Sequence, residues 1–207
     1  MNRDPHNEVR EKIVQAAQER LWHYGFKKTT IEEIAADAGI GKGTIYLHFN
    51  SKEDIALEIV MQYKKQSLEQ IRAAAADESL PLLHRIKKML TLPILAAQER
   101  YSRSPATLEM VTAIRPTIQN HLKPLLQEEV AILAQVLDQG NSLGELAIDD
   151  TRHAAQTLKN MCSGFWPPYP CVSGLEAMTA AISDIVDMAL AGCGAKRAAP
   201  EHHYEVK

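Results

Sequence analysis

Two short segments with helical apolar spacing, residues 30–38 and 42–49, are joined by only three residues, 39–41 (Gly-Ile-Gly). Neither segment is long enough to bury a hydrophobic core alone, so both must pack against another element. Residues 9–24 supply that element, because they repeat apolar side chains at helical intervals. A unit of about 45 residues with three helices and a tight turn before the last one has the helix-turn-helix architecture.

Capping signals mark the ends of these helices. Thr30 can accept the backbone N–H of Glu33 while the Glu33 side chain reaches back, which is a capping box. Ser51 with Asp54 predicts a similar start for a long helix that continues to about residue 75. Gly25 stands where the first helix should stop.

The rest of the chain also has helical periodicity, so we predict an all-α fold of about nine helices. Residues 140–144 are expected to form a loop, and residues 166–170 (Trp-Pro-Pro-Tyr-Pro) cannot be helical. We place a helix-turn-helix domain at residues 1–52 and a larger helical domain at residues 53–207. The further helices are predicted at about residues 82–99, 104–114 (Ser104 as N-cap, Pro105 at the first position), 117–139 (Pro124 as a kink or as the true first turn), 150–165 (capped by Asp149 or Asp150) and 173–191.

The third helix of the N-terminal unit has a candidate DNA-reading surface. At about 100° per residue, Ile45 and Phe49 point inward together, whereas Gly43 and Leu47 lie opposite them. No acidic residue occurs between residues 39 and 52. The outward groups are a cation, a hydroxyl, a phenol and an imidazole, which can donate hydrogen bonds to phosphate oxygens and base edges.

Net charge gives this prediction almost no support. The chain has a formal charge of −3, with 8 Lys and Arg against 7 Asp and Glu in residues 1–52 and 15 against 19 in residues 53–207. This asymmetry is too small to identify a nucleic-acid-binding protein. The DNA-binding prediction therefore depends on the geometry and order of the residues.

Residues 25–60, GFKKTTIEEIAADAGIGKGTIYLHFNSKEDIALEIV, closely resemble the DNA-binding region of the tetracycline-repressor (TetR) family. The turn, the KGTIYLHF helix and the following SKED stand in the order of the family. Leu47 stands where the family often has an aromatic residue, which favours an apolar contact such as a thymine methyl. The resemblance implies that Thr30 and Lys52 flank the DNA-facing set on the backbone. That set is Lys42, Gly43, Thr44, Tyr46, Leu47 and His48.

The resemblance also implies a homodimeric repressor that binds a palindromic double-stranded DNA operator and is released by a small-molecule effector. In the family the larger domain binds the effector, and its last two helices form a four-helix bundle across the dimer axis. The small and apolar side chains of those helices, which equally describe an ordinary core face, are Ala154, Ala155, Leu158, Met161, Ala177, Ala181, Ile185 and Met188.

An effector pocket inside the larger domain is a further implication of the resemblance. Candidate wall residues, all of types that are more common in a core, are Met89, Tyr101, Met110, Phe165 and Trp166. Few aromatic residues and no evident inward carboxylate pair argue against a large aromatic cation. The sequence leaves a flat, flexible or acyl-like effector as an open alternative.

Enzyme and metal-site patterns are weak. Residues 41–44 (Gly-Lys-Gly-Thr) are similar to a phosphate loop, but Ala36 and Gly43 stand where the Walker pattern needs Gly and Ser or Thr. No nucleophile stands at a recognisable spacing from a base, so we expect no enzyme. No HExxH or CxxC spacing indicates a metal or cofactor, and His202-His203 in the polar tail could bind a metal only weakly.

Cysteine usage and the chain's apolar runs predict a cytoplasmic protein. Cys162, Cys171 and Cys193 are expected to be free thiols, and a redox or soft-metal site at the first two is the alternative. The polar N-terminus does not resemble a signal peptide, and no apolar run approaches the ~18 residues of a membrane span.

Three functional hypotheses stay open. The leading one is the ligand-responsive repressor. The second is a helix-turn-helix activator or architectural DNA binder without an effector, which predicts a closed larger domain. The third is a small-molecule-binding protein or enzyme with a vestigial N-terminal unit, which predicts no affinity for DNA at low salt.

Overall fold

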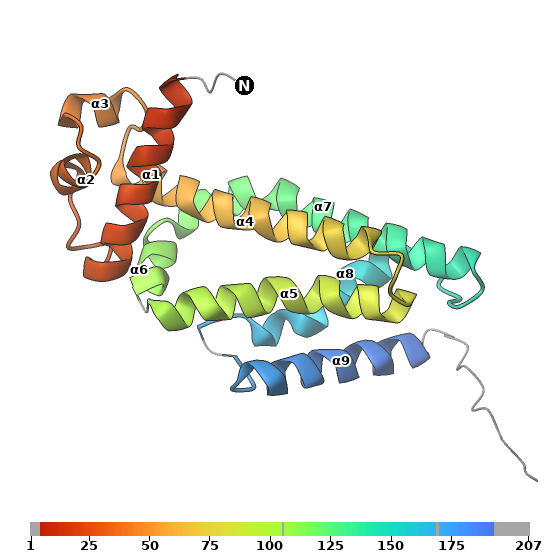
Figure 1. Ribbon diagram of the computed structural model, residues 1–207. Helices are drawn as coiled ribbons and strands as arrows, with labels where there is room; N and C mark the ends of the chain where they lie inside the picture. The colour runs from red at the N-terminus through yellow and green to blue at the C-terminus, as the bar shows by residue number, and fades with distance from the viewer. Residues whose placement is uncertain (1–4, 105, 169, 193–207) are drawn as a thin grey trace, which may run out of the picture.

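The computed structural model describes residues 5–104, 106–168 and 170–192. Over these residues the chain forms nine α-helices, one short 3-10 helix and no β-strand, which confirms the predicted all-α fold (Figure 1). In chain order the elements are α1 (Pro5–Tyr24), α2 (Ile31–Asp37), α3 (Lys42–Tyr46), α4 (Lys52–Ala76), α5 (Leu82–Arg103), α6 (Ala106–Ala113), α7 (Arg115–Ser142), α8 (Thr151–Met161), η1 (Cys162–Phe165) and α9 (Leu175–Gly192). None of the described helices is both long and apolar enough to cross a membrane.

The first three helices form the unit that the apolar spacing predicts. α1 packs against α2, and α2 packs against α3. The chain turns at Gly25 and Gly39, whose φ angles of 87° and 66° lie in the left-handed region that favours glycine. The buried side chains that hold this unit together are Ile13, Val14, Ala17, Leu21, Phe26, Ile34, Ala35, Ile45 and Phe49.

The predicted caps begin α2 and α4. The Glu33 N–H donates to Thr30 Oγ1 at 3.3 Å and the Thr30 N–H donates to Glu33 Oε2 at 2.9 Å, which confirms the capping box. At α4 the Asp54 N–H donates to Ser51 Oγ at 3.1 Å. The Asp54 carboxylate accepts the N–H of Asn50, one residue before the position that a full capping box would use.

α3 is shorter than predicted, because it ends at Tyr46 rather than at about Phe49. The N–H groups of Leu47 and His48 donate to carbonyls three residues back, so the chain tightens after the helix. The Phe49 N–H still donates to the Ile45 carbonyl at 2.9 Å. This last turn keeps Phe49 on the buried side together with Ile45, as predicted.

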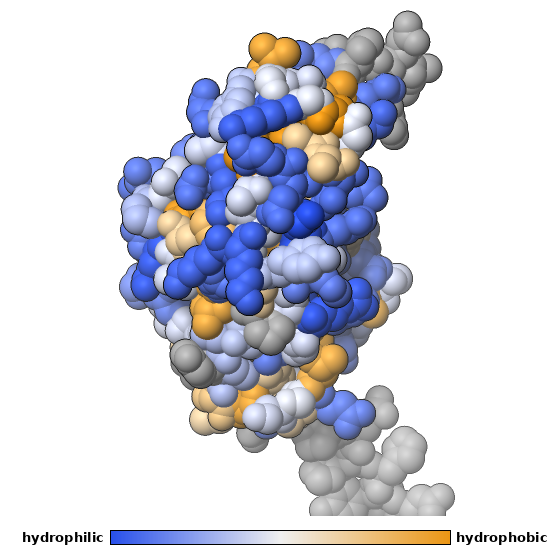
Figure 2. Space-filling model, turned by 90° about the vertical axis from the view of Figure 1, so that its left-hand side faces the viewer, coloured by the Kyte–Doolittle hydropathy of each residue, from blue (hydrophilic) through white to orange (hydrophobic). Residues whose placement is uncertain are grey.

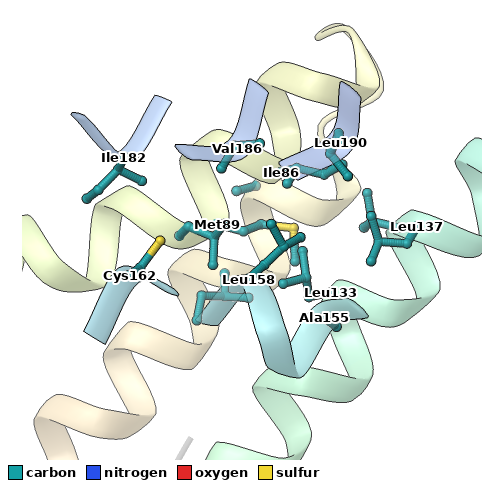
Figure 3. Packing of buried hydrophobic residues seen from close by; sticks show 14 of the residues in the cluster. Ile86, Met89, Leu133, Leu137, Ala155, Leu158, Cys162, Ile182, Val186 and Leu190 are labelled. Carbon is teal, nitrogen blue, oxygen red and sulfur yellow. The ribbon is translucent and has the colours of Figure 1, made fainter. Parts of the chain in front are cut away.

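α4 contributes to two hydrophobic clusters. Ile55 and Ile59 pack under the N-terminal unit, whereas Ile71 and Ala74 belong to the core of the larger bundle. α4 packs against α5 and α7, α7 packs against α8, and α5 packs against α9 (Figure 1). Figure 3 shows the bundle core, where the labelled side chains of α5, α7, α8 and α9 converge.

The start and end of α7 differ from the prediction. The helix begins at Arg115 with a proline in its first turn, so Pro124 lies well inside it. The predicted loop at 140–144 is wrong in its first part, because α7 continues to Ser142. A Cβ at Gly140 would lie 2.5 Å from Leu146, so this glycine permits close packing rather than breaking the helix. The left-handed residue that ends the segment is Gly144, with a φ of 71°.

The C-terminal helices follow the prediction with shifted ends. Asp150 caps α8, because its carboxylate accepts the His153 N–H at 2.9 Å. The predicted helix over 150–165 changes to 3-10 geometry at Cys162, and Trp166 is not helical, as predicted. Ser104 does not cap α6 with its side chain, which donates instead to the Trp22 carbonyl. Predictions that involve Pro105, Tyr169, Cys193 and the polar tail fall on residues outside the described ranges.

Candidate nucleic-acid interface and interior cavity

The outward surface of α3 and of the turn after it projects from the molecule. A Cβ at Gly43 would meet nothing within 4 Å. Tyr46 is 49% exposed and Leu47 is 77% exposed, while Thr44 is half-buried. The surface predicted from helical geometry is therefore outward-facing and available to a partner.

Lys42 has a partner on the neighbouring helix. Its Nζ donates to Glu32 Oε1 of α2 at 2.5 Å and lies 5.8 Å from the centre of the Tyr46 ring. This hydrogen bond raises the pKa of Lys42 and lowers the pKa of Glu32. Both side chains are at least half exposed, so water screens the pair and a stronger anion can replace the carboxylate.

His48 is less available than its neighbours. It is half-buried, and its ring centre lies 4.2 Å from that of His6. Burial lowers the pKa of His48, and the nearby charges of His6 and Arg10 lower it further. An imidazole with a lowered pKa is neutral at pH 7, so His48 can offer a hydrogen bond there but no charge.

The two flanking positions, Thr30 and Lys52, support local structure. Lys52 Nζ donates to the carbonyls of Phe26 and Thr29, each at 2.7 Å, and lies 4.3 Å from the centre of the Phe26 ring. It therefore fastens the loop before α2 to the start of α4. Thr30 is exposed but is engaged in the capping box of α2.

Glu109 on α6 is a residue that sequence reasoning missed. Its Oε1 accepts the backbone N–H of Lys27 at 2.8 Å, and a Cβ at Gly25 would lie 3.0 Å from its Oε2. The Ser104 hydroxyl, just before α6, donates to the Trp22 carbonyl at 2.8 Å. These contacts tie α6 to the end of α1 and to the loop after it. Gly25 is the one sequence signal of this contact, and it does not identify the partner.

A cavity of about 400 Å³ lies between α4, α5, α6, α7 and the segment after η1. This volume is in the range of small-ligand pockets. Tyr101, Met110 and Trp166, which were predicted as pocket residues, line it. Met89 and Phe165, also predicted, do not: each is 3% exposed and belongs to the bundle core, where Figure 3 shows Met89 near Leu158. Apolar character alone does not separate a cavity wall from a core.

Cationic groups reach this cavity from two helices. Lys64 of α4 pairs with Glu129 of α7, which is 2% exposed and also pairs with Lys159 of α8. Burial lowers the pKa of Lys64, although Glu129 acts in the opposite direction. The guanidinium of Arg100 lies 4.7 Å from the centre of the Tyr63 ring. Burial lowers the pKa of Arg100 and raises that of Tyr63 to about 12, so Tyr63 stays protonated at neutral pH.

α8 and α9 have apolar side chains toward the core and toward the outside. Ala155 and Leu158 are buried in the protein's own core (Figure 3). Met161 and Met188 are 44% and 75% exposed. Ala177 is also exposed, whereas Ala154, Ala181 and Ile185 pack partly buried against the core. Figure 2 shows apolar surface at its lower end, toward α9, and mainly hydrophilic surface across its middle.

The two cysteines that the structure describes are not part of a metal site. Cys162 is buried and Cys171 is exposed, and both are free thiols. Burial raises the pKa of the Cys162 thiol to about 11, which makes it a poor nucleophile at neutral pH. Over the residues that the structure describes, no three His, Cys, Asp or Glu side chains gather where they could hold a metal ion. Cys193 and His202-His203 lie outside those residues.

Known proteins resemble this chain in sequence and in fold. The family model described as bacterial regulatory proteins, tetR family, matches residues 13–59. The HTH-type transcriptional repressor BepR of Brucella suis biovar 1 (strain 1330) is 31% identical over 166 residues, which are 76% of this chain and 78% of BepR. The HTH-type transcriptional regulator QacR of Staphylococcus aureus (strain Mu50 / ATCC 700699) is 26% identical over 166 residues, 75% of this chain and 83% of QacR. A crystal structure of a TetR-family regulator from Mesorhizobium loti MAFF303099 has the same fold, with a TM-score of 0.75 and 20% identity over 93% of this chain and 100% of that chain.

Proposed function

The chain belongs to the tetR family of bacterial regulatory proteins, and we propose that it is a dimeric cytoplasmic repressor that a small-molecule effector releases from a palindromic operator. The observation that carries the effector-dependent part is the position of α6. Met110 and Val111 of α6 line the cavity, and Glu109 of the same helix holds the backbone of Lys27. An occupant of the cavity would therefore act on the DNA-binding unit directly.

In this proposal residues 1–52 are the DNA-binding unit, and α3 enters the major groove. Tyr46 and Leu47 are the exposed large hydrophobic side chains of this surface and reach the base edges, with Leu47 suited to a thymine methyl. Lys42 exchanges the Glu32 carboxylate for a phosphate, and Gly43 allows the backbone to approach closely.

The other predicted positions have smaller roles. Thr44 and His48 supply hydrogen bonds at the edge of the surface, His48 as a neutral imidazole. Thr30 presents the N-terminus of α2 to the phosphate backbone. Lys52 acts on DNA indirectly, because its donors hold the loop before α2.

Residues 53–207 are proposed to hold two such units at the correct spacing. A single unit makes few contacts, and two recognition helices must reach half-sites about 34–36 Å apart. The exposed side of α8 and α9, with Met161, Ala177 and Met188, supports a dimer interface there. Isologous contacts between two copies would remove these side chains from water.

Effector binding is proposed to change the position of the N-terminal unit through two routes. Tyr63 of α4 lines the cavity and stacks on Trp22 of α1, with ring centres 6.5 Å apart. Glu109 of α6 provides the second route. Release requires that the effector bind the DNA-incompetent arrangement more tightly, because equal affinity for both arrangements would change nothing.

Selection of DNA from a random pool by the purified protein tests this function. We expect two inverted half-sites whose centres are separated by about one helical turn, or about 10 base pairs. Enrichment of a single half-site would contradict the dimeric arrangement. Absence of any enriched sequence at low salt would contradict DNA reading itself and favour a protein with a vestigial N-terminal unit.

A Glu109→Ala variant then tests the coupling. We expect it to bind the selected operator and to bind a cavity ligand, but to release the operator less readily when the ligand is added. Normal release by this variant would show that the contact between Glu109 and the Lys27 backbone does not transmit the signal. An operator complex that no cavity ligand disturbs would favour an activator or architectural protein.

A further inference from the structure

The cavity combines apolar walls with an excess of positive charge. Leu108, Val111 and Leu122 are among its apolar wall residues, and Lys64 and Arg100 are its charged ones. No carboxylate belongs to its lining over the described residues. A ligand that fits these walls must be largely apolar, and its charged group, where it has one, meets cations.

The nearby carboxylate does not neutralise these cations. Glu129 lies behind the lining and is shared by Lys64 and Lys159, so two lysines surround one glutamate. Arg100 forms no ion pair within 4.0 Å in the described part of the chain, and its sequence neighbour Glu99 pairs with Arg103 instead. The three cations Lys64, Lys159 and Arg100 therefore stand against the single carboxylate of Glu129, which is an excess of two positive charges. Charges removed from water are stable only when they are paired.

Hydrogen-bonding groups near the cations also lack partners. Tyr63 and Thr107 both line the cavity, and their hydroxyl oxygens are buried with no hydrogen-bond partner among the described residues. Because the Tyr63 pKa is raised to about 12, its hydroxyl remains a donor at neutral pH. The Arg100 guanidinium lies over the ring of the same tyrosine, 4.7 Å from the ring centre. Two residues in contact thus supply a cation and a hydroxyl donor, and neither has an acceptor among the described residues.

We infer that the effector is a hydrophobic acid, whose anionic head group takes the Arg100 guanidinium and the Tyr63 hydroxyl as donors while its aliphatic or aromatic body lies against Leu108, Val111 and Leu122. That the acid acts as an effector rests on the proposed function, but its binding in the cavity does not depend on DNA. The acid supplies the counter-charge that the cavity lacks, and it links α5, which carries Arg100, to α4, which carries Tyr63. Charge-assisted bonds of this kind give an acid an advantage over its neutral analogue.

The test compares each acid with its own amide on the full-length protein by isothermal titration calorimetry. The probes are octanoate with octanamide, 2-naphthoate with 2-naphthamide, and octylamine as the cation. We expect at least one acid to bind roughly 10- to 100-fold more tightly than its amide, and octylamine not to bind. The inference is overturned if the amides bind as tightly as the acids, if octylamine binds best, or if neither acid binds.

Variants locate the head group. Arg100→Gln should weaken acid binding by roughly 10- to 100-fold and leave the affinity for amides unchanged. Arg100→Lys should retain part of the preference for acids. Arg103→Gln is the matched control, because Arg103 is an exposed cation of the same helix that does not line the cavity. An Arg100→Gln variant that is folded by circular dichroism and prefers acids as the wild type does would contradict the assignment.

Gel shifts with the selected operator separate the two proposals. If the acid binds but the operator stays bound, the ligand class stands and the effector function fails. If octylamine or an amide releases the operator and the acid does not, the effector function stands and the ligand class fails.

Discussion

The α3 surface and the wall of the cavity each contain an ion pair between a lysine and a glutamate. The first pair is exposed to water and the second is buried. At the surface, Lys42 and Glu32 are 50% and 59% exposed. In the interior, Lys64 and Glu129 are 11% and 2% exposed, and Lys159 shares the same glutamate. The pKa values of the two lysines shift in opposite directions. The hydrogen bond to Glu32 raises the pKa of Lys42 above its ordinary value, whereas burial lowers the pKa of Lys64 below it.

This difference separates an exchangeable ion pair from a fixed one. Water already screens the surface pair, so replacing Glu32 by a phosphate costs little and gives Lys42 a partner of higher charge. The interior carboxylate is 2% exposed, so water screens it little, and removing it leaves Lys64 and Lys159 without their counter-charge. The first kind of pair suits the proposed DNA-binding surface, where a phosphate replaces the carboxylate, and the second kind suits the wall of a cavity.

Replacement of the interior glutamate has the largest expected effect. Glu129→Gln keeps the shape of the side chain but leaves Lys64 and Lys159 without a counter-charge. We expect a loss of about 3–5 kcal/mol in the free energy of unfolding. Urea denaturation measures it, at a fixed protein concentration because the midpoint of the proposed dimer would depend on concentration.

The adjacent residue provides the matched control. Glu128 pairs with Arg72, and the two side chains are 40% and 52% exposed. Glu128→Gln should therefore change the free energy of unfolding by less than about 1 kcal/mol. Equal losses in the two variants would mean that burial does not distinguish the interior pair, and the comparison would break.

Truncation of Tyr46 has the next largest effect, and it acts on DNA rather than on stability. Tyr46→Ala should lower operator affinity by about 1–3 kcal/mol for each half-site, which approaches complete loss in a gel shift of the dimer. Tyr24→Ala, which removes a 54% exposed tyrosine from α1, is the control. Equal affinities of the two variants would exclude Tyr46 from the contact. Size-exclusion chromatography should give the wild-type elution volume for both.

Salt dependence distinguishes the two lysines directly. Lys42→Ala should reduce the slope of log affinity against log salt by about 1.8 in a dimer, because one phosphate contact is lost in each half-site. Lys64→Met should leave the slope unchanged, because a buried lysine releases no counterions from DNA. An unchanged slope for Lys42→Ala would mean that Lys42 keeps its pair with Glu32 in the complex.

The two regions also differ in how far the sequence predicts them. The helix-turn-helix unit depends on local signals, such as the Thr30–Glu33 capping box and the left-handed turn at Gly39, so its outward residues follow from helical geometry. The cavity is formed by residues of α4 to α7 and of the segment after η1, far apart in the chain. No local pattern distinguishes Met110, which lines the cavity, from Met89, which lies in the core.

The sequence also does not predict which partner a lysine has in the free protein. The sequence places Lys42 on the outward surface, but it does not reveal that Glu32 of the preceding helix already occupies its ammonium group. The same is true of Lys52, whose position indicates a phosphate contact, although its Nζ is engaged by the carbonyls of Phe26 and Thr29. Such pairs depend on how the helices pack against one another, and residue spacing along one helix does not determine this packing.

Removal of Glu32 has the smallest expected effect and is the sharpest test of exchangeability. In the free protein this carboxylate pairs with Lys42, and a DNA phosphate must displace it on binding. Glu32→Gln should therefore raise operator affinity, by less than about fivefold because the pair is exposed. The gain should shrink as salt is raised and should vanish in the Lys42→Ala background, since the competition needs both partners. Glu53→Gln, which removes an exposed carboxylate from the first turn of α4, controls for the general loss of negative charge near DNA. If both glutamine variants gain equally, the effect is one of overall charge. If Glu32→Gln alone lowers affinity, the pair instead positions Lys42 for its phosphate, and the surface pair is as fixed in function as the interior one.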